Sequence, residues 1–199
     1  MKKGLKKYFS EGLLIVFSVL FALFINRMSE NYSTKQQKNV ALSNVIKELR
    51  NNQSTLKKWK DKHSKMSLNI SNVVEGKNDS IKDLLNKSNF LNFGLLTDGK
   101  SLINSVLSDT AWETAKATNI ISEFDFEIIQ QLTQTYKMQK VLSEKTIGSI
   151  TSLYFSTEAH QMKNLESTLL QFSLRFNELV GQEQTLDYMY NNTLEFLNK

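Results

Sequence analysis

The sequence predicts an all-α protein in which an N-terminal transmembrane helix continues into a long juxtamembrane helix, followed by a helical bundle. The 199 residues contain no Pro and only 7 Gly, so little in the chain interrupts long helices. One apolar run near the N-terminus is long enough to cross a bilayer, and apolar residues recur farther along at three- and four-residue spacings. We therefore divide the chain into a basic leader (1–7), an anchor (8–27), a juxtamembrane helix (28–75) and a bundle packing on that helix (76–199).

The anchor is predicted from residues 8–25, where Glu11 is the only charge. As a helix this run spans about 27 Å, close to the ~30 Å hydrocarbon core of a bilayer. The residues at the end of the run, FINRMSENY, contain no pair of small residues placed as in an Ala-x-Ala cleavage site, which indicates an uncleaved signal anchor. The basic residues flanking the run predict a cytoplasmic N-terminus and a periplasmic bundle on the bacterial inner membrane. Those before it are Lys2, Lys3, Lys6 and Lys7, and those after it are Arg27, Lys35 and Lys38.

Polar residues at both ends of the anchor are candidate membrane-interface residues. Glu11 lies one turn after Lys7, where the two can pair near the headgroups, although an acid within a span can also mark a functional site. Asn26 and Arg27 mark the opposite interface. Ten Lys or Arg but only three acids fall between Arg27 and Lys65, and this basic stripe favours anionic lipid headgroups over nucleic acid as the partner.

Apolar residues then follow a seven-residue repeat over residues 42–73. Eight of its ten core positions are apolar: Leu42, Val45, Leu49, Asn52, Leu56, Trp59, His63, Met66, Ile70 and Val73. One interpretation is a homo-oligomeric parallel coiled coil through 42–73, with Asn52 fixing its register. The other is a helix packing within its own chain, which Ile46 and Val74 favour by widening the stripe. His63 is either a pH switch or a polar residue tolerated in the core.

The remaining chain predicts further helices. Ser80 and Asp83 have capping-box spacing ahead of a helix over 81–91, and a short helix is expected over 102–107. Thr110 and Glu113 form a second capping box, with Trp112 as a core residue. A long helix follows from Glu123 to Tyr154. An apolar stripe over 162–179 is expected to end at Gly181, with a last helix over 186–197.

Gly94, Gly99, Lys100 and Ser101 match the spacing of a phosphate-binding P-loop. That chemistry requires a buried strand before the loop, and the sequence predicts none. The alternative is a loop in which Ser101 caps the helix at 102–107. His63 and His160 lie far apart, and no catalytic spacing occurs. We therefore expect no enzyme activity, no cofactor and no metal.

Two segments of the chain read SEGLLIVFSVLFALFINRMSENY and SDTAWETAKATN. They resemble an uncharacterised family of short single-pass membrane proteins common in the Bacteroidetes. The family pattern has a Glu near the start of the span, an Ile-Asn-x-Trp-x-Glu exit and an Ala-Trp-x-x-Ala element. The matching residues are Glu11, Ile25, Asn26, Glu30, Ala111, Trp112 and Ala115, followed by a helix with Gln139 near its middle. Met28 replaces the usual Trp, and Glu11 precedes Gly12 where the reverse order is typical. The resemblance implies an anchored helical protein without assigned catalytic residues.

These observations predict a membrane-anchored binding or scaffold protein that contacts lipid and an unidentified protein partner. Two alternatives stay open. One is an extracytoplasmic helical sensor domain, since helical bundles on membrane stalks often receive ligands. The other is a nucleotide-binding protein, which depends on the spacing at residues 94–101 alone.

Overall fold

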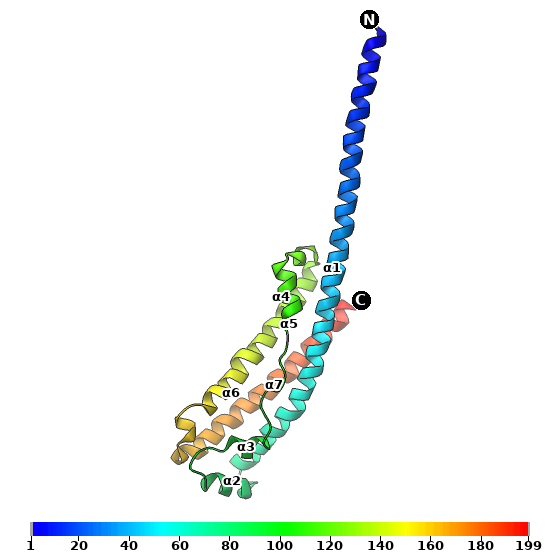
Figure 1. Cartoon of the computed structure of the whole chain (residues 1–199). Coiled ribbons are helices and arrows are strands. Elements are labelled where there is room, and N and C mark those ends of the chain that lie inside the picture. The colour runs from blue at the N-terminus through cyan, green and yellow to red at the C-terminus, as the bar shows by residue number, and fades with distance from the viewer. Residues whose placement is uncertain (1, 199) are drawn as a thin grey trace.

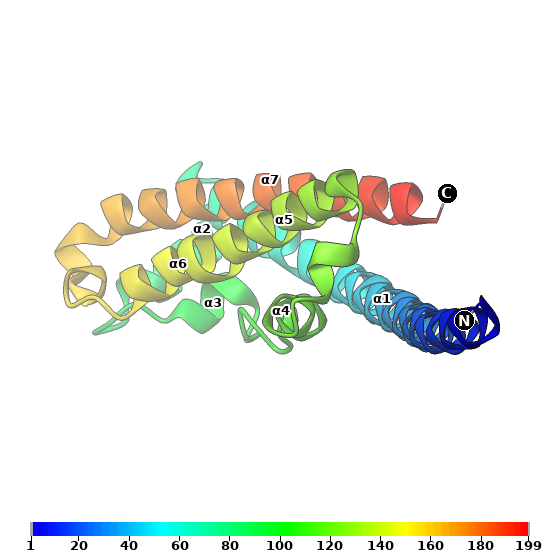
Figure 2. The same ribbon diagram turned by 90° about the horizontal axis from the view of Figure 1, so that it is seen from above.

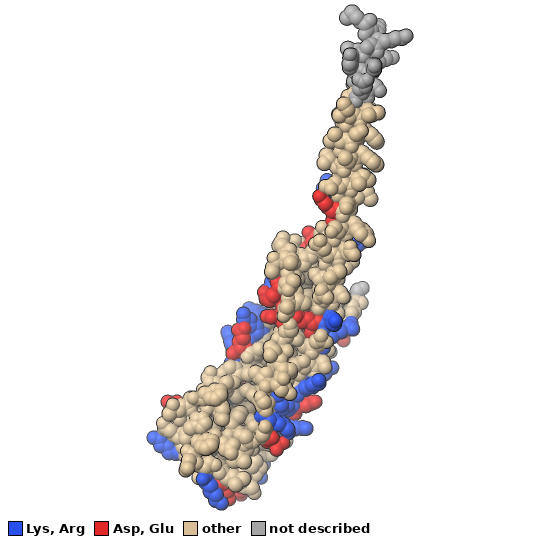
Figure 3. All heavy atoms as spheres, in the orientation of Figure 1, with Lys and Arg blue, Asp and Glu red and all other residues tan. Residues whose placement is uncertain are grey.

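A computed structural model describes the backbone of residues 2–198 and the side chains of residues 12–198. Its longest element is α1 (Lys2–Val74), a single helix of 73 residues that runs through both the predicted anchor and the predicted juxtamembrane helix. Residues 12–26 carry no charge and are exposed on all sides, and α1 is long and apolar enough to cross a membrane (Figure 3). The candidate interface side chains of Lys2, Lys3, Lys6, Lys7 and Glu11 lie outside the described residues.

Two further rods pack beside the second half of α1. The first is continuous and consists of α5 (Phe126–Lys140), the π-helical η2 (Val141–Thr146) and α6 (Ile147–Tyr154). The second is α7 (Leu165–Leu197), which runs antiparallel to α1 and to the first rod (Figures 1 and 2). No strand occurs in residues 2–198, so the all-α prediction is confirmed for the described chain.

Short elements connect these rods. After α1 come α2 (Asp79–Asn86) and α3 (Phe93–Thr97) at the far end of the molecule. The chain then returns along the rods to α4 (Thr110–Ala117) and η1 (Ile120–Glu123), which lie beside the middle of α1 (Figure 1). Two single turns, η3 (Glu158–His160) and η4 (Met162–Asn164), join α6 to α7.

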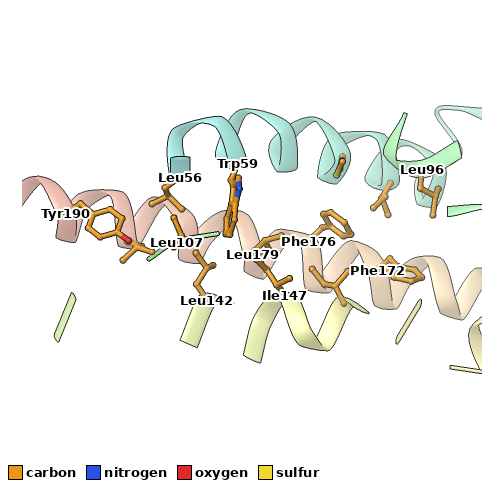
Figure 4. Close-up of a cluster of buried hydrophobic side chains, with 14 of the residues drawn as sticks. Leu56, Trp59, Leu96, Leu107, Leu142, Ile147, Phe172, Phe176, Leu179 and Tyr190 are labelled. Atoms are coloured by element: carbon orange, nitrogen blue, oxygen red, sulfur yellow. The ribbon is translucent and has the colours of Figure 1, made fainter. Parts of the chain in front are cut away.

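The predicted seven-residue stripe of α1 is buried inside one chain. Nine of its ten positions are buried and Leu42 is half-buried. The stripe faces apolar residues of α7 such as Phe172, Phe176 and Leu179, with Leu142 and Ile147 on the opposite side of α7 (Figure 4). Because these side chains pack within the chain, against α7 and the segment over residues 100–109, pairing between chains would have to use another face of α1.

The predicted helix over 102–107 is wrong. Residues 100–109 are non-helical and form a strap that runs along α1 from α3 to α4 (Figure 1). Polar atoms of α1 hold the strap: Lys62 Nζ donates to the Ser101 carbonyl (2.9 Å) and Trp59 Nε1 donates to Ser105 Oγ (3.3 Å). The Ser101 carbonyl accepts from Lys62, whereas in a helix over 102–107 it would accept from one of the helix's own amides, so tertiary contacts override the local preference for helix.

Two predicted helix ends also differ. Helix α2 begins at Asp79 and ends at Asn86 rather than Leu91, and its cap is Asn78, whose Oδ1 accepts from Ile81 N (3.3 Å), instead of Ser80. Helix α7 continues through Gly181, which is therefore no C-cap. A Gly inside a helix costs about 1 kcal/mol, less than the burial of apolar residues before and after it contributes.

Candidate binding groove between α1 and α4

A groove of about 830 Å³ lies between α1 and α4. One wall is α1 from Ser33 to Asn52, about 28 Å of helix, and the other is α4 with Thr118 and Ile120. The groove begins six residues after Arg27, where the uncharged segment ends. Its lining is uncharged except for Lys47 and Glu48. We call this feature the α1–α4 groove.

Short side chains make room for the groove. On α4 the lining residues are Thr110, Ala111, Thr114 and Ala115, and on α1 Ala41 lies among Ser, Asn and Gln residues. Ala115 is only 2% exposed, so α4 sits close against its neighbours. Helices bearing small residues can approach closely and leave open space on the outer side of their contact. A third helix could fill that space.

The inner end of the groove is closed by a buried carboxylate, Glu48 of α1. Its Oε2 accepts from Ser108 Oγ (2.7 Å) and from Ala111 N (2.8 Å). Its Oε1 accepts from Tyr136 OH (2.7 Å) and more weakly from Trp112 N (3.4 Å). Glu48 therefore anchors the strap, α4 and α5 to α1 at one point.

Glu48 also replaces the predicted capping box of α4. The N-cap position, Asp109, makes no side-chain cap bond, and Glu113 pairs with Lys116 (2.6 Å) instead of reaching back to Thr110. Free amides at a helix N-terminus attract negative charge, so a carboxylate from another helix satisfies the first turn. Sequence spacing alone does not reveal this partner, which lies more than sixty residues away.

An amide network lies beside Glu48. Asn52 Oδ1 accepts from Ser108 N (2.8 Å), while Asn52 Nδ2 donates to the Ser108 carbonyl (2.6 Å). Gln139 Nε2 donates to the same carbonyl (3.0 Å), and Gln139 Oε1 accepts from Tyr190 OH (2.6 Å). Ser108 is thereby bound on both backbone groups, which fixes the end of the strap where α4 begins.

Two buried tyrosines show that this network is shielded from water. Burial raises the pKa of Tyr136 far above its ordinary value, and the hydrogen bond to Glu48 adds to the shift. Burial also raises the pKa of Tyr190, with a further contribution from the Glu48 charge. Both phenols stay protonated as hydrogen-bond donors under all ordinary conditions. The cluster is a set of satisfied polar contacts that fixes one wall of the groove.

Trp112, the predicted core residue, is 4% exposed. Its ring stacks on that of Tyr136, with 5.7 Å between centroids and 2° between planes, and Lys116 Nζ lies 5.6 Å from the Trp112 ring centroid. Trp112 thus attaches α4 to α5, and it does not line the groove.

The P-loop-like residues do not form a cradle. Gly94 lies in α3, and Gly99 follows it in a left-handed turn (φ 67°). Gly94 N donates to Asn92 Oδ1 and Gly99 N to the Gly94 carbonyl, so these amides are already used. Lys100 pairs with exposed Asp98 (2.6 Å).

The prediction that Ser101 caps a helix over 102–107 is also wrong. Ser101 Oγ donates to the Ile103 carbonyl (2.8 Å) within the strap, where no helix begins.

His63 has a buried partner that the sequence did not predict. His63 Nδ1 lies 2.5 Å from Glu183 Oε1 of α7, and its Nε2 lies 2.8 Å from the Leu102 carbonyl. A carbonyl only accepts, so in the contact with Leu102 the ring nitrogen Nε2 is the donor. His63 therefore ties the strap to α7 across α1.

Sequence reasoning missed the polar network because its members come from four separate segments. Glu48 lies in α1, Ser108 in the strap, Tyr136 and Gln139 in α5 and Tyr190 in α7, and these residues share no spacing motif. The only available signal was Asn52, a polar residue at a core position of the α1 stripe. Comparison with family models, with curated proteins and with solved structures gave no match. The resemblance to the Bacteroidetes family therefore stays a prediction.

Proposed function

We propose that the protein is a membrane-anchored helical binding protein that presents the α1–α4 groove to a protein partner close to the bilayer. The observation that carries the proposal is the groove itself, a cleft about 28 Å long whose lining is uncharged except for Lys47 and Glu48 and is formed on the α4 side by short side chains. Its wall is fixed by the Glu48 cluster, so the cleft is formed before a partner arrives. A preformed site loses less entropy on binding.

The proposed setting is the bacterial inner membrane, with a cytoplasmic N-terminus and the bundle in the periplasm. The basic leader before the apolar run supports this orientation. Because α1 is one helix, the groove would lie between about 9 and 38 Å from Arg27 along the helix axis. Arg27, Lys35 and Lys38 stay within about 17 Å of that point, whereas Lys47 to Lys65 lie about 30–57 Å away. Lipid contacts are therefore proposed only for the first group.

A photocrosslinking amino acid placed on α1 tests the groove as a binding surface. Asn44 lines the groove, while its neighbour Ser43 is exposed and lies about 100° around the helix, outside the groove. We expect adducts in native membranes from position 44 and none from position 43. Thr114→Trp fills the cleft from the exposed side of α4 and should abolish the adducts. Equal labelling at 43 and 44, or labelling that survives Thr114→Trp, would contradict the proposal.

A further inference from the structure

Another cavity, of about 380 Å³, lies where η1 approaches α1 shortly after the uncharged segment ends. None of the residues that line it lines the α1–α4 groove. Its lining consists of two amines, one carboxylate and three uncharged polar side chains, and we call it the α1–η1 pocket. Five of these residues belong to α1 and the last belongs to η1: Asn31, Thr34, Lys35, Lys38, Asn39 and Glu123.

In the proposed membrane setting, the α1–η1 pocket begins at the depth of the lipid headgroups. Asn31 follows Arg27 by about 6 Å along the helix axis, and Lys35 follows it by about 12 Å. The headgroup layer outside the hydrocarbon core is about 5–7 Å thick on each side of a bilayer. Side chains of an α-helix lean toward its N-terminus, so the amine of Lys35 can reach back into this layer. The pocket therefore adjoins the part of the bilayer that contains phosphate groups.

Two lysines give the α1 side of the pocket positive charge. Lys38 is half-buried, and its Nζ lies 3.8 Å from Oδ1 of Asp125, two residues after η1. Lys35 is exposed and makes no ion pair with any side chain of residues 12–198. A lysine amine is a common partner of phosphate, and the Thr and Asn side chains of the lining add hydrogen-bond donors. This side of the pocket therefore suits a phosphodiester.

The η1 side of the pocket has the opposite charge. Glu123 is exposed, and within the described side chains it also has no ion-pair partner. A carboxylate accepts hydrogen bonds from an ammonium group and repels a ligand that carries only negative charge. The lining therefore matches a headgroup that has a phosphate and an ammonium group side by side.

We propose that the α1–η1 pocket binds the phosphoethanolamine headgroup of a membrane lipid. The phosphate lies at Lys35 and Lys38, and the ammonium group donates to Glu123. Phosphatidylglycerol has no ammonium group, and the ammonium of phosphatidylcholine has no N–H to donate. Phosphatidylethanolamine is therefore the lipid that uses both sides of the pocket. This inference rests on the membrane setting of the proposed function, and it does not depend on the α1–α4 groove.

Two exposed aromatic side chains beside the pocket support its contact with a bilayer. Tyr32, 74% exposed, follows Asn31 on α1. Phe126, 77% exposed, follows Asp125, the residue that contacts Lys38. Aromatic residues are enriched where proteins cross the boundary between membrane and water. A headgroup layer at this level would cover both rings, which the chain itself leaves in solvent.

Native mass spectrometry of the full chain in detergent tests the headgroup preference, with lipids of identical acyl chains at equal concentration. We expect phosphatidylethanolamine to bind about three- to fivefold more tightly than phosphatidylcholine or phosphatidylglycerol, as one exposed charge pair provides. Glu123→Gln should weaken the binding of phosphatidylethanolamine and strengthen that of phosphatidylglycerol. Glu127→Gln is the matched control, because Glu127 is exposed and does not line the pocket. This variant should keep the wild-type order of the three lipids.

The lysine side of the pocket has its own pair of variants. Lys35→Gln should weaken the binding of all three lipids, because each carries the phosphate. Lys57→Gln, at an exposed position about 45 Å from Arg27, should weaken none. Equal wild-type affinities for the three lipids, tightest binding of phosphatidylglycerol, or the same response to Glu123→Gln and Glu127→Gln would overturn the proposal. Equal helical circular dichroism of all four variants excludes misfolding as the cause.

Soluble glycerophosphoethanolamine distinguishes a lipid from a free headgroup as the occupant. It has the same phosphate and ammonium groups but no acyl chains to hold it beside α1. We expect it to leave bound phosphatidylethanolamine in place at equal concentration, because attachment to the membrane raises the effective concentration of the lipid headgroup. Displacement at equal concentration would overturn a lipid as the occupant. Adducts from position 44 report on the α1–α4 groove alone, so failure of the pocket and failure of the groove are separate results.

Discussion

Helix α1 is packed on two neighbouring faces that differ in chemistry. The face toward α7 is an apolar seam, in which Leu49, Leu56 and Ile70 are fully buried in one core with residues of α7 such as Phe172 and Leu186. The face toward the strap, α4 and α5 is a polar seam that includes Glu48, Asn52 and His63. Apolar contact is non-directional, so the first seam tolerates small shifts, whereas hydrogen bonds fix the second seam at particular atoms. The polar seam therefore determines where α4, and with it the groove, is placed.

The largest expected effect comes from the apolar seam. Phe176→Ala removes a side chain that is 0% exposed and leaves a cavity between α1 and α7, so we expect a loss of about 3–5 kcal/mol in the free energy of unfolding. Denaturant unfolding of the full chain in detergent, followed by circular dichroism, measures this loss. A loss below about 1 kcal/mol would show that the seam is loosely packed and would remove the contrast between the two faces.

The apolar seam could be predicted from the sequence and the polar seam could not. Positions such as Leu49, Leu56, Phe172 and Leu179 repeat at helical spacing, and periodicity alone identifies the face that each helix buries. Glu48 instead bonds to residues 60 to 88 positions away, and its carboxylate has no periodic signature. The strap was mistaken for a helix for the same reason, because its backbone partners Asn52 and His63 lie on α1. The groove depends on both features and was therefore not predicted.

Tyr136→Phe tests the polar seam. The variant loses the phenol that donates to Glu48 (2.7 Å), which should cost about 1–2 kcal/mol at pH 7. Burial and Glu48 raise the pKa of Tyr136 above its ordinary value of 10.0. Below pH 10 the phenol is neutral in both states, so its contribution to stability is fully present. Above pH 10 the Tyr136 phenol ionises only in the unfolded chain. The free energy of unfolding of the wild type therefore falls by about 1.4 kcal/mol per pH unit for each buried tyrosine of this kind.

Because Tyr190 behaves in the same way, Tyr136→Phe should remove about half of this alkaline dependence. The difference in stability between wild type and variant should therefore shrink as pH rises from 10 to 11. Denaturant unfolding at pH 7, 10 and 11 measures it. Tyr188→Phe, at an exposed tyrosine, is the matched control and should change the free energy of unfolding by less than about 0.5 kcal/mol. A constant difference across this range would contradict the buried polar seam.

The smallest expected effect concerns Lys100. Its contact with Asp98 is as short as the hydrogen bonds of Glu48, but it is exposed to solvent. The Lys100 and Asp98 side chains are 53% and 72% exposed, so water and salt screen their attraction. The hydrogen bond and charge of Lys100 lower the pKa of Asp98. Lys100→Ala should therefore raise that pKa toward its ordinary value, measured by NMR titration, while the unfolding midpoint stays unchanged.

Titration of ATP with Mg²⁺ into the full chain should give no saturable signal, because the amides of Gly94 and Gly99 are already bonded within the chain. Micromolar binding that Lys100→Ala abolishes would instead show that this loop rearranges around phosphate. Burial would then no longer distinguish functionally important polar contacts from unimportant ones.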